Sequence, residues 1–397
     1  MRIGLLREGK NPPDKRVPFS PTQCRDIIHS YPGISIYIQP SSFRCFQDSE
    51  YQKNGVELSE NLSMCNVVMG VKEVPLNMLI PNKVFFFFSH TIKKQPYNKN
   101  LLQEIISKKI QLVDYETLVD QENNRIIGFG RYAGIVGCYN TFLAYGKKHK
   151  KYNLAFAHML DNKKELESEL KKVQLPQDFK IVLTGLGRVS GGAKEILDFL
   201  HIKQVHKDEF VNTIYNHPVY TQLETMDYYK RIDGTDSLKS DFYQFPEKYT
   251  SNLTDYCSSV QMLITGHYHA PNNPILLSNN DINSTNFSLD VVGDISCDIN
   301  GPIASTIRPS TISNPIYGYN PISKLEDDYM KDNVIAVMAV DNLPCSLPQD
   351  ASIDFGNVFI EDVLPDLINN GPIINRASIT INGVLTEKFN YLSDYVL

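Results

Sequence analysis

The stretch that decides the fold runs Lys180-Ile-Val-Leu-Thr184 and continues as Gly185-Leu-Gly187-Arg-Val-Ser-Gly191-Gly192. An apolar strand enters a glycine-rich turn, and residues 193–200 then follow a helical pattern. Such a turn lets the backbone approach a pyrophosphate, and the helix after it presents unpaired N–H groups and the positive end of its dipole. The spacing is GxGxxxG, with the small Ser190 at the third position of the stricter GxGxxG pattern. The stretch predicts a dinucleotide site; the alternative is a turn whose glycines serve packing.

The end of the next strand decides which nicotinamide dinucleotide would bind. In NAD-binding domains, an acidic residue about 20 positions after the glycines binds the adenosine ribose. The next expected strand ends in Gln204-Val-His206-Lys207-Asp208, which places His206 at that position and Asp208 two residues later. An acid there would favour NAD, whereas His206, Lys207 and Arg188 could tolerate a 2′-phosphate. The sequence therefore leaves the choice between NAD and NADP open.

Short apolar runs alternate with helical patterns over most of the chain. The expected strands are residues 3–6, 34–38, 67–71, 84–88, 110–114, 180–183, 289–292 and 334–339, and the expected helices include 22–29, 99–108 and 131–148. Nearly uninterrupted apolar strands between helices favour parallel sheets covered on both faces. We predict an α/β fold with two Rossmann-like domains, residues 1–138 plus 325–397 and residues 139–324. The C-terminal segment would complete the first domain.

Composition and charge exclude several classes of function. The 397-residue chain has a formal net charge of −6, which argues against nucleic-acid binding, because phosphate neutralisation needs clustered basic residues. No apolar run approaches the roughly 20 residues needed to cross a bilayer. The first residues enter a strand-like run and lack the pattern of a targeting segment. Seven scattered cysteines without a CxxC pair are typical of a reducing compartment. These features predict a cytoplasmic protein without nucleic-acid or membrane partners.

Charged residues after the strands of the first domain form a second candidate site. The carboxyl ends of parallel strands form the ligand crevice of an open sheet, so Arg7, Lys72 and His90 should converge at one edge. A lysine and a histidine side by side repel each other's charge, so one of them can serve as a base near neutral pH. Arg16 and Arg125 could hold carboxylates bidentately. The alternative, for each residue alone, is a solvated charge or a hydrogen-bonded cap.

Two further clusters lie in the second domain. Asp294 follows an expected strand and could contact the nicotinamide ribose or the substrate amine, or could simply form a turn. His267 and His269 have the alternating spacing of a metal pair, but no third ligand accompanies them, so we predict no metal.

Several longer motifs occur together, almost from end to end of the chain. They include Arg16-Val-Pro-Phe-Ser-Pro, Val71-Lys-Glu-Val-Pro, Phe87-Phe-Ser-His-Thr-Ile-Lys, Tyr132-Ala-Gly-Ile-Val-Gly, the glycine turn and Asp341-Asn-Leu-Pro-Cys-Ser-Leu-Pro. In this combination the chain resembles the lysine-forming saccharopine dehydrogenases, or lysine–2-oxoglutarate reductases, of the alanine dehydrogenase and transhydrogenase fold group. It looks most similar to the reductase half of the animal aminoadipic semialdehyde synthases.

The resemblance implies a reaction and a role for each matching residue. NAD(P)H would deliver a hydride to the imine formed from lysine and 2-oxoglutarate to give saccharopine, or the reverse reaction would run. Lys72 and His90 would act as acid–base groups, and Arg16, Gln95 and Arg125 would bind substrate. The implied cofactor contacts are Gly185, Gly187, Arg188, Val189, His206, Thr265, Gly266, His267 and Asp294. NAD-dependent fungal members have an acid where His206 stands, so this departure leaves the cofactor preference open.

Two other interpretations remain. One is a related amino-acid dehydrogenase with another amine or 2-oxoacid. The other is a non-catalytic nucleotide-binding subunit of the transhydrogenase type. The presence of both Lys72 and His90 favours catalysis, because a cofactor carrier needs neither. The sequence does not fix the direction of the reaction, the amine or the oligomeric state.

Overall fold

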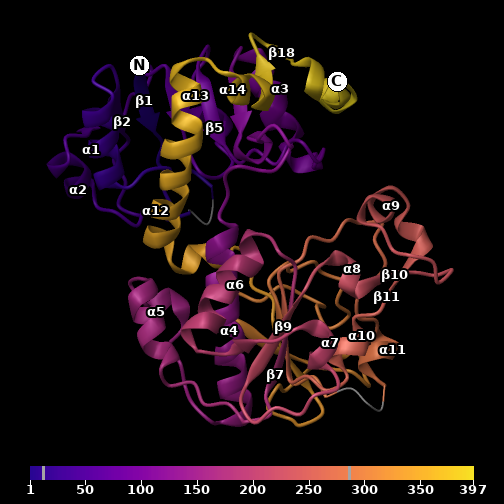
Figure 1. Cartoon of the computed structure of the whole chain (residues 1–397). Helices are drawn as coiled ribbons and strands as arrows, with labels where there is room; N and C mark the ends of the chain where they lie inside the picture. Colours follow the sequence, from indigo (N-terminus) through magenta and orange to yellow (C-terminus); the bar gives the residue numbers. More distant parts are fainter. Residues whose placement is uncertain (11–13, 285–287) are drawn as a thin grey trace. The chain divides into compact units, whose positions relative to one another are not determined.

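The computed structural model describes residues 1–10, 14–284 and 288–397 (Figure 1). They divide into two compact units, unit 1 with residues 1–129 and 348–397, and unit 2 with residues 130–347. The boundaries expected from the sequence, after 138 and 324, differ from this division. Helix α4 (Gly130–His149) packs along α6 (Arg188–Phe199), and strand β16 (Ile335–Met338) pairs with β13 (Val291–Asp294), so all four elements belong to unit 2.

Unit 1 is built on a mixed sheet of eight strands. Their spatial order is β18 (Val384–Leu385), β17 (Ser378–Ile381), β6 (Gln111–Asp114), β5 (Val84–Phe87), β4 (Val67–Met69), β1 (Arg2–Leu5), β2 (Ser35–Ile38) and β3 (Glu57–Leu58). The strands from β6 to β3 are parallel. The two strands of the C-terminal segment, β17 and β18, are antiparallel additions at the edge. The C-terminal segment thus completes this sheet, as predicted, although not in the parallel sense.

Helices cover both faces of this sheet because successive strand residues point to opposite sides. On β5, Phe86 joins a core cluster with residues of α1 (Pro21–Ser30) and α12 (Pro348–Val358). Phe85 and Phe87 join a second cluster with residues of α3 (Lys99–Ser107). The other helices of unit 1 are α2 (Asp48–Lys53), α13 (Leu364–Ile368), α14 (Pro372–Ala377) and α15 (Ser393–Val396).

Unit 2 is built on a second sheet of eight strands. Their order is β15 (Leu325–Asp327), β14 (Ile316–Asn320), β16, β13, β12 (Met262–Thr265), β7 (Lys180–Thr184), β9 (Val219–Leu223) and β8 (Lys203–Gln204). The strands from β16 to β8 are parallel, and β14 and β15 are antiparallel at one edge. The remaining elements are the hairpin β10 (Tyr229–Arg231) and β11 (Tyr249–Ser251) and the helices α5 (Lys163–Leu170), α7 (Lys207–Phe210), α8 (Thr225–Tyr228), α9 (Lys239–Gln244), α10 (Thr254–Cys257) and α11 (Asn279–Ile282).

The strand beside β7 is β9, whereas the sequence analysis expected the segment that contains β8 to follow β7 in the sheet. β9 pairs with β7 over its whole length, and β8 pairs with the outer side of β9. The reason is burial: four of the five β9 residues are buried, whereas both residues of β8 are exposed. The strand that buries more apolar surface, β9, therefore occupies the position next to β7, and β8 lies at the edge of the sheet.

The predicted fold class is confirmed, with two Rossmann-like sheets that are mostly parallel rather than purely parallel. Because β9 and β12 flank β7 on opposite sides, the carboxyl end of β7 is the point where the strand order changes direction. Ligand crevices form at such points in open α/β sheets. Among the described residues, no helix is both long and apolar enough to cross a membrane.

Candidate active site

The glycine turn connects β7 to α6 in unit 2. Gly185 has a φ of +89°, and a Cβ at this position would lie 2.6 Å from the carbonyl oxygen of Gly266. Gly187 is the N-cap of α6, and it has no side chain that could cap the helix. A Cβ on Gly187 would meet open space. The positive end of the dipole of α6 therefore suits an anionic group such as a phosphate.

Other glycines of this region serve helix packing. A Cβ on Gly192 would lie 1.9 Å from the Arg131 carbonyl oxygen, and one on Gly134 would lie 1.8 Å from the Val189 carbonyl oxygen. Helices α4 and α6 therefore lie backbone to backbone (Figure 1). The hydroxyl of Ser190, which is buried, donates to the Gly187 carbonyl over 3.1 Å. The packing interpretation of the glycine stretch thus applies at Gly192, whereas the open space at Gly187 is compatible with the predicted dinucleotide site.

Hydrogen bonds tie the ends of β9 and β12 to this turn. The Gly185 N–H donates to the Leu223 carbonyl over 2.8 Å, and Gln222 Nε2 donates to the Gly185 carbonyl over 2.9 Å. On the other side, the Gly266 N–H donates to the Thr184 carbonyl over 3.0 Å. The turn, the end of β9 and the end of β12 are therefore connected by hydrogen bonds at one edge of the sheet of unit 2, where the candidate nucleotide site lies.

His206 lies farther out than the sequence analysis expected. It is the N-cap of α7 after the edge strand β8, and its side chain is 66% exposed. Strand β9 lies between β8 and β7. The structure therefore does not place His206 beside the glycine turn. Arg188 and Val189, by contrast, directly follow Gly187 and lie in the first turn of α6, which begins five residues before the expected start of the helix at residue 193.

His267 has an unused ring nitrogen beside the turn. Its Nδ1 lies 2.6 Å from the hydroxyl of Thr184, which itself accepts the Gly266 N–H over 3.3 Å. The tautomer of the ring determines which of Nδ1 and the hydroxyl is the donor. Burial lowers the pKa of His267 to about 4, so the ring is neutral at pH 7. Nε2 is buried without a partner among the described residues. This unpartnered nitrogen and the start of α6 fit a dinucleotide.

A hydrogen bond between the side chains of Thr265 and Asp294 connects the ends of β12 and β13. The Thr265 hydroxyl donates to Asp294 Oδ1 over 2.7 Å, and the Thr306 hydroxyl donates to Oδ2 over 2.6 Å. The Ser296 hydroxyl also donates to Oδ1, over 2.7 Å. Both Asp294 oxygens are thus engaged and the residue is fully buried. The Asp294 side chain thus connects the loops that follow β12 and β13. The sequence analysis gave this structural role in a turn as the alternative to a ligand contact.

The two histidines after β12 have different partners. His267 contacts Thr184, whereas His269 Nε2 lies 3.3 Å from the Pro274 carbonyl oxygen. Within residues 1–10, 14–284 and 288–397, no group of three or more His, Cys, Asp or Glu side chains could hold a metal ion.

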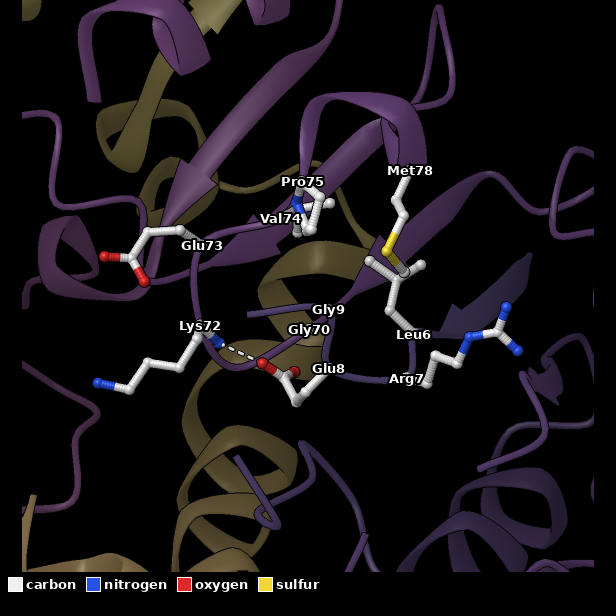
Figure 2. Close-up of a pocket in the computed structure, with 10 residues that line it drawn as sticks. All are labelled: Leu6, Arg7, Glu8, Gly9, Gly70, Lys72, Glu73, Val74, Pro75 and Met78. Atoms are coloured by element: carbon white, nitrogen blue, oxygen red, sulfur yellow. Dashed lines mark hydrogen bonds between the residues drawn. The ribbon is translucent and has the colours of Figure 1, made fainter. Parts of the chain in front are cut away.

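In unit 1, Lys72 lies in a loop that Glu8 holds through the backbone. The Glu8 carboxylate accepts the Val71 N–H over 2.7 Å and the Lys72 N–H over 2.9 Å (Figure 2). Desolvation of this carboxylate outweighs the two hydrogen bonds and raises the pKa of Glu8 to about 7. Figure 2 shows the Lys72 side chain pointing away from Glu8, and the Arg7 side chain pointing to the opposite side. Arg7 pairs with Glu60 over 2.8 Å, so the expected convergence does not include it.

His90 follows β5 and is oriented by Glu73, the residue after Lys72. His90 Nδ1 lies 2.7 Å from Glu73 Oε1, and Lys10 Nζ lies 2.8 Å from Oε2. Burial would raise the pKa of Glu73, but the hydrogen bonds from His90 and Lys10 outweigh it and lower the pKa to about 2. Glu73 is therefore ionised at neutral pH, and its Oε1 accepts a hydrogen bond from Nδ1–H. That bond fixes the tautomer of a neutral His90, so Nε2 is the nitrogen that can take up a proton.

The two predicted substrate arginines have different surroundings. Arg16 is buried, and two of its nitrogens hydrogen-bond to Asp14. Nε donates to Oδ1 over 3.0 Å, and Nη2 donates to Oδ2 over 2.6 Å. Burial alone would raise the pKa of Asp14, but the charge and the hydrogen bonds of Arg16 outweigh this effect and lower the pKa of Asp14 to about 2. Arg125 is 37% exposed, donates from Nε to the Ile127 carbonyl and lies 3.4 Å from Glu116. Of the two, Arg125 has the more accessible guanidinium.

Aromatic rings bring three of these residues into one patch. The Arg16 guanidinium lies 4.1 Å from the Phe129 ring centroid, and that of Arg125 lies 5.4 Å from the Phe88 centroid. Phe88 also stacks on His90 and contacts Phe129, with centroid distances of 6.4 and 6.0 Å. Cations over ring faces are held by the ring quadrupole. The structure therefore brings Arg16, Arg125 and His90 together.

Gln95 lies in the loop after β5, at the N-cap of the 3₁₀ turn Pro96–Asn98. Its carbonyl accepts a hydrogen bond from the Tyr395 hydroxyl in α15. This hydrogen bond connects Gln95 to the C-terminal segment.

The sequence analysis missed Glu73, Asp14 and Glu8 as parts of this site. Each is adjacent or close in sequence to a predicted residue, in Lys72-Glu73, Asp14-Lys-Arg16 and Arg7-Glu8. An acid beside a predicted base or arginine was the available signal, because such acids orient and neutralise their neighbours.

Comparisons with known proteins agree with this geometry. Residues 4–136 match the model of the alanine dehydrogenase/PNT N-terminal domain. The chain is 30% identical to mouse alpha-aminoadipic semialdehyde synthase over 98% of its own length and 47% of that protein. It is 31% identical to the Arabidopsis thaliana protein of that name over 98% of its length and 41% of the relative. The chain thus spans about half the length of these relatives.

A shorter relative aligns almost end to end. The lysine-forming, NAD-dependent saccharopine dehydrogenase of Schizosaccharomyces pombe is 24% identical, with 94% of this chain and 95% of that protein covered. The fold resembles a solved L-alanine dehydrogenase, with a TM-score of 0.64 and 13% identity over the whole of both chains. It also resembles a transhydrogenase from Sinorhizobium meliloti, with a TM-score of 0.62 and 12% identity over 97% of this chain and 100% of that one. The resemblance predicted from the motifs is confirmed.

Proposed function

We propose that this chain, whose residues 4–136 belong to the alanine dehydrogenase/PNT N-terminal domain family, is a saccharopine dehydrogenase of the lysine-forming type. It would use NAD(H) or NADP(H) to interconvert saccharopine with lysine and 2-oxoglutarate. The relative that aligns almost end to end is named as a lysine-forming saccharopine dehydrogenase that uses NAD(+). The observation that carries the proposal is the His90–Glu73 pair in the matching domain, in which Glu73 directly follows Lys72 in the chain. A histidine oriented by a carboxylate suits proton transfer, which a cofactor carrier does not need.

The chemistry sets definite tasks for the protein. The ε-amine of lysine adds to the keto carbon of 2-oxoglutarate, water leaves, and the imine is reduced to saccharopine. A bound NAD(P)H supplies the hydride. The amine must lose a proton before it attacks, and the carbinolamine oxygen must gain one before it leaves as water. Nε2 of His90, freed by the Glu73 hydrogen bond, suits the first transfer. The Lys72 ammonium suits the second.

Substrate recognition would rest on the aromatic patch of unit 1. The accessible Arg125 guanidinium above Phe88 suits a carboxylate of 2-oxoglutarate. Arg16, whose charge is compensated by Asp14, would position Phe129. In unit 2, the start of α6 suits the pyrophosphate, and His267 Nε2 would form a hydrogen bond with another polar atom of the dinucleotide.

The test is oxidation of NADH and of NADPH by the purified chain with 2-oxoglutarate and a panel of amines. We expect turnover with lysine, saccharopine as the product by mass spectrometry, and at least about tenfold lower kcat/KM with ornithine, whose chain is one methylene shorter. Pyruvate in place of 2-oxoglutarate is the matched control for the second carboxylate. Turnover with another amine but not with lysine would replace this proposal by the related dehydrogenase.

A further inference from the structure

The strand order of unit 2 changes which residue faces the adenosine end of a dinucleotide. The acid that binds the ribose hydroxyls in NAD-binding domains follows the strand next to the glycine-turn strand. That neighbour of β7 is β9, which pairs with it from Lys180–Val219 to Thr184–Leu223. The residue directly after β9 is Glu224, an exposed glutamate.

Glu224 is held close to the turn by its neighbours in sequence. Leu223 accepts the Gly185 N–H over 2.8 Å, and the Gln222 side chain donates to the Gly185 carbonyl over 2.9 Å. One strand end is therefore fixed to the turn through the two residues before Glu224. His206, by comparison, follows β8 at the edge of the sheet, with β9 in between.

The local charges leave Glu224 as an acceptor. Glu224 is the N-cap of α8, and its N–H donates to Asp227 Oδ2 over 2.8 Å. The Asp227 carboxylate is paired with Lys207, so its charge is compensated. Among the described residues, Glu224 has no such cationic partner within ion-pair distance. An uncompensated, exposed carboxylate at a strand end accepts hydrogen bonds from hydroxyl groups and repels a phosphate.

We propose that Glu224 binds the adenosine ribose hydroxyls and makes this chain prefer NAD(H) over NADP(H). The inference rests on the proposed function, in that unit 2 must bind a nicotinamide dinucleotide. It extends that function by assigning the preference between NAD and NADP, which the sequence left open, to Glu224. This residue lies outside the segment 204–208, where the spacing from the glycines had placed the ribose-binding position.

The test is direct titration of the purified full chain with NADH and NADPH, by calorimetry or by the fluorescence of the reduced nicotinamide. We expect the wild type to bind NADH at least about tenfold more tightly than NADPH. Glu224→Gln keeps an oxygen that can accept the backbone N–H at the cap and removes the charge. This variant should lower the ratio of the two affinities by at least about tenfold. Glu224→Ser, with another good N-cap residue, is the second variant should the first fail to fold.

Variants at two nearby residues distinguish Glu224 from the alternative ribose-binding residues, Asp208 and His206. Asp208→Asn removes the same charge from the adjacent helix and should leave the ratio within about twofold. His206→Asp adds a carboxylate where the sequence spacing placed the ribose residue, and it should also leave the ratio within about twofold. An unchanged ratio in Glu224→Gln, or a ratio raised by His206→Asp, would overturn the assignment of Glu224. A wild type that binds neither dinucleotide at millimolar concentration would instead overturn the proposed function.

Discussion

The two units carry separate candidate sites that are built in different ways. The candidate site of unit 2, which we call the nucleotide half of the chain, consists mainly of backbone groups, namely the turn at Gly185, the uncapped start of α6 and the strand ends that hydrogen-bond to the turn. The candidate site of unit 1, which we call the substrate half, consists of side chains that constrain one another, such as Glu73 with His90 and Asp14 with Arg16. Backbone groups bind by position alone, whereas side-chain pairs set charge and proton position. The first half suits cofactor binding and the second suits catalysis.

The largest effect should come from the proton-transfer groups of the substrate half. Lys72→Met keeps the length of the side chain and removes its charge, and His90→Gln keeps hydrogen bonding but does not titrate near neutral pH. Each should lower kcat by about two orders of magnitude or more, because positioned acids and bases contribute about 10²- to 10⁴-fold. Steady-state kinetics and NAD(P)H titration check this, and the dinucleotide affinity should change less than about twofold.

A double variant tests whether Lys72 and His90 act as a unit. In that case the combined loss in kcat should be much smaller than the product of the single losses. Near-normal turnover in both single variants, with an unchanged pH profile, would show that the two residues are structural and would break the contrast between the halves.

The next effect concerns the carboxylate that orients His90. Glu73→Gln keeps a hydrogen-bonding group but removes the negative charge and the fixed proton on Nδ1. We expect kcat to fall about tenfold to a hundredfold and the pH dependence of kcat/KM to shift, because the histidine loses its ionised partner. The pH–rate profile measures this. Lys10→Met, which removes only the outer partner of Glu73, should cost less than Glu73→Gln; the reverse order would contradict this account of His90.

The nucleotide half should respond to bulk on the backbone. Gly187→Val puts a branched side chain into the open space before α6, where the pyrophosphate is proposed to lie. Dinucleotide affinity should fall at least about tenfold, or roughly 1.4 kcal/mol, while the fold persists. Gly191→Val on the same helix is the matched control, because a Cβ there also meets open space. Unchanged dissociation constants for NADH and NADPH in Gly187→Val would remove the turn from the site.

The smallest expected effect is a pH dependence of stability from Glu8. Its pKa in the folded chain is raised from 4.5 to about 7, so between these values the folded state holds a proton that the unfolded state has lost. Stability therefore falls as the pH rises from about 4.5 to about 7. Glu8→Gln does not titrate and should lack this component. Urea unfolding at pH 5 and pH 8 compares the two, and parallel changes would contradict the raised pKa.

The sequence was informative where a local pattern determines the structure. Residues 180–199 contain a strand, a glycine turn and a helix in one stretch, so this order of elements was predictable, although α6 begins at Arg188 and not at residue 193 as expected. The strands of unit 1 were also predictable, because runs such as Val84–Phe87 are apolar throughout, and the last three residues of this run are buried.

Long-range relations were not accessible in the same way. The place of β9 beside β7 depends on how much surface each strand buries, and the run Val219-Tyr-Thr-Gln-Leu223 follows Pro218 without a periodic pattern that would rank it above residues 203–208. The partnership of Arg16 with Asp14 depends on the conformation of a loop. The antiparallel addition of β17 to β6 depends on chain direction at the sheet edge, which residue types do not encode.

Isotope transfer tests the central claim most directly. The chain would be incubated with lysine, 2-oxoglutarate and nicotinamide dinucleotide carrying deuterium at the transferable C4 position, and the product would be examined by mass spectrometry. The account predicts saccharopine that carries one deuterium from the dinucleotide and is not formed when Lys72→Met and His90→Gln are combined. Oxidation of the dinucleotide without deuterated saccharopine, or formation of that product at an undiminished rate by the double variant, would contradict it.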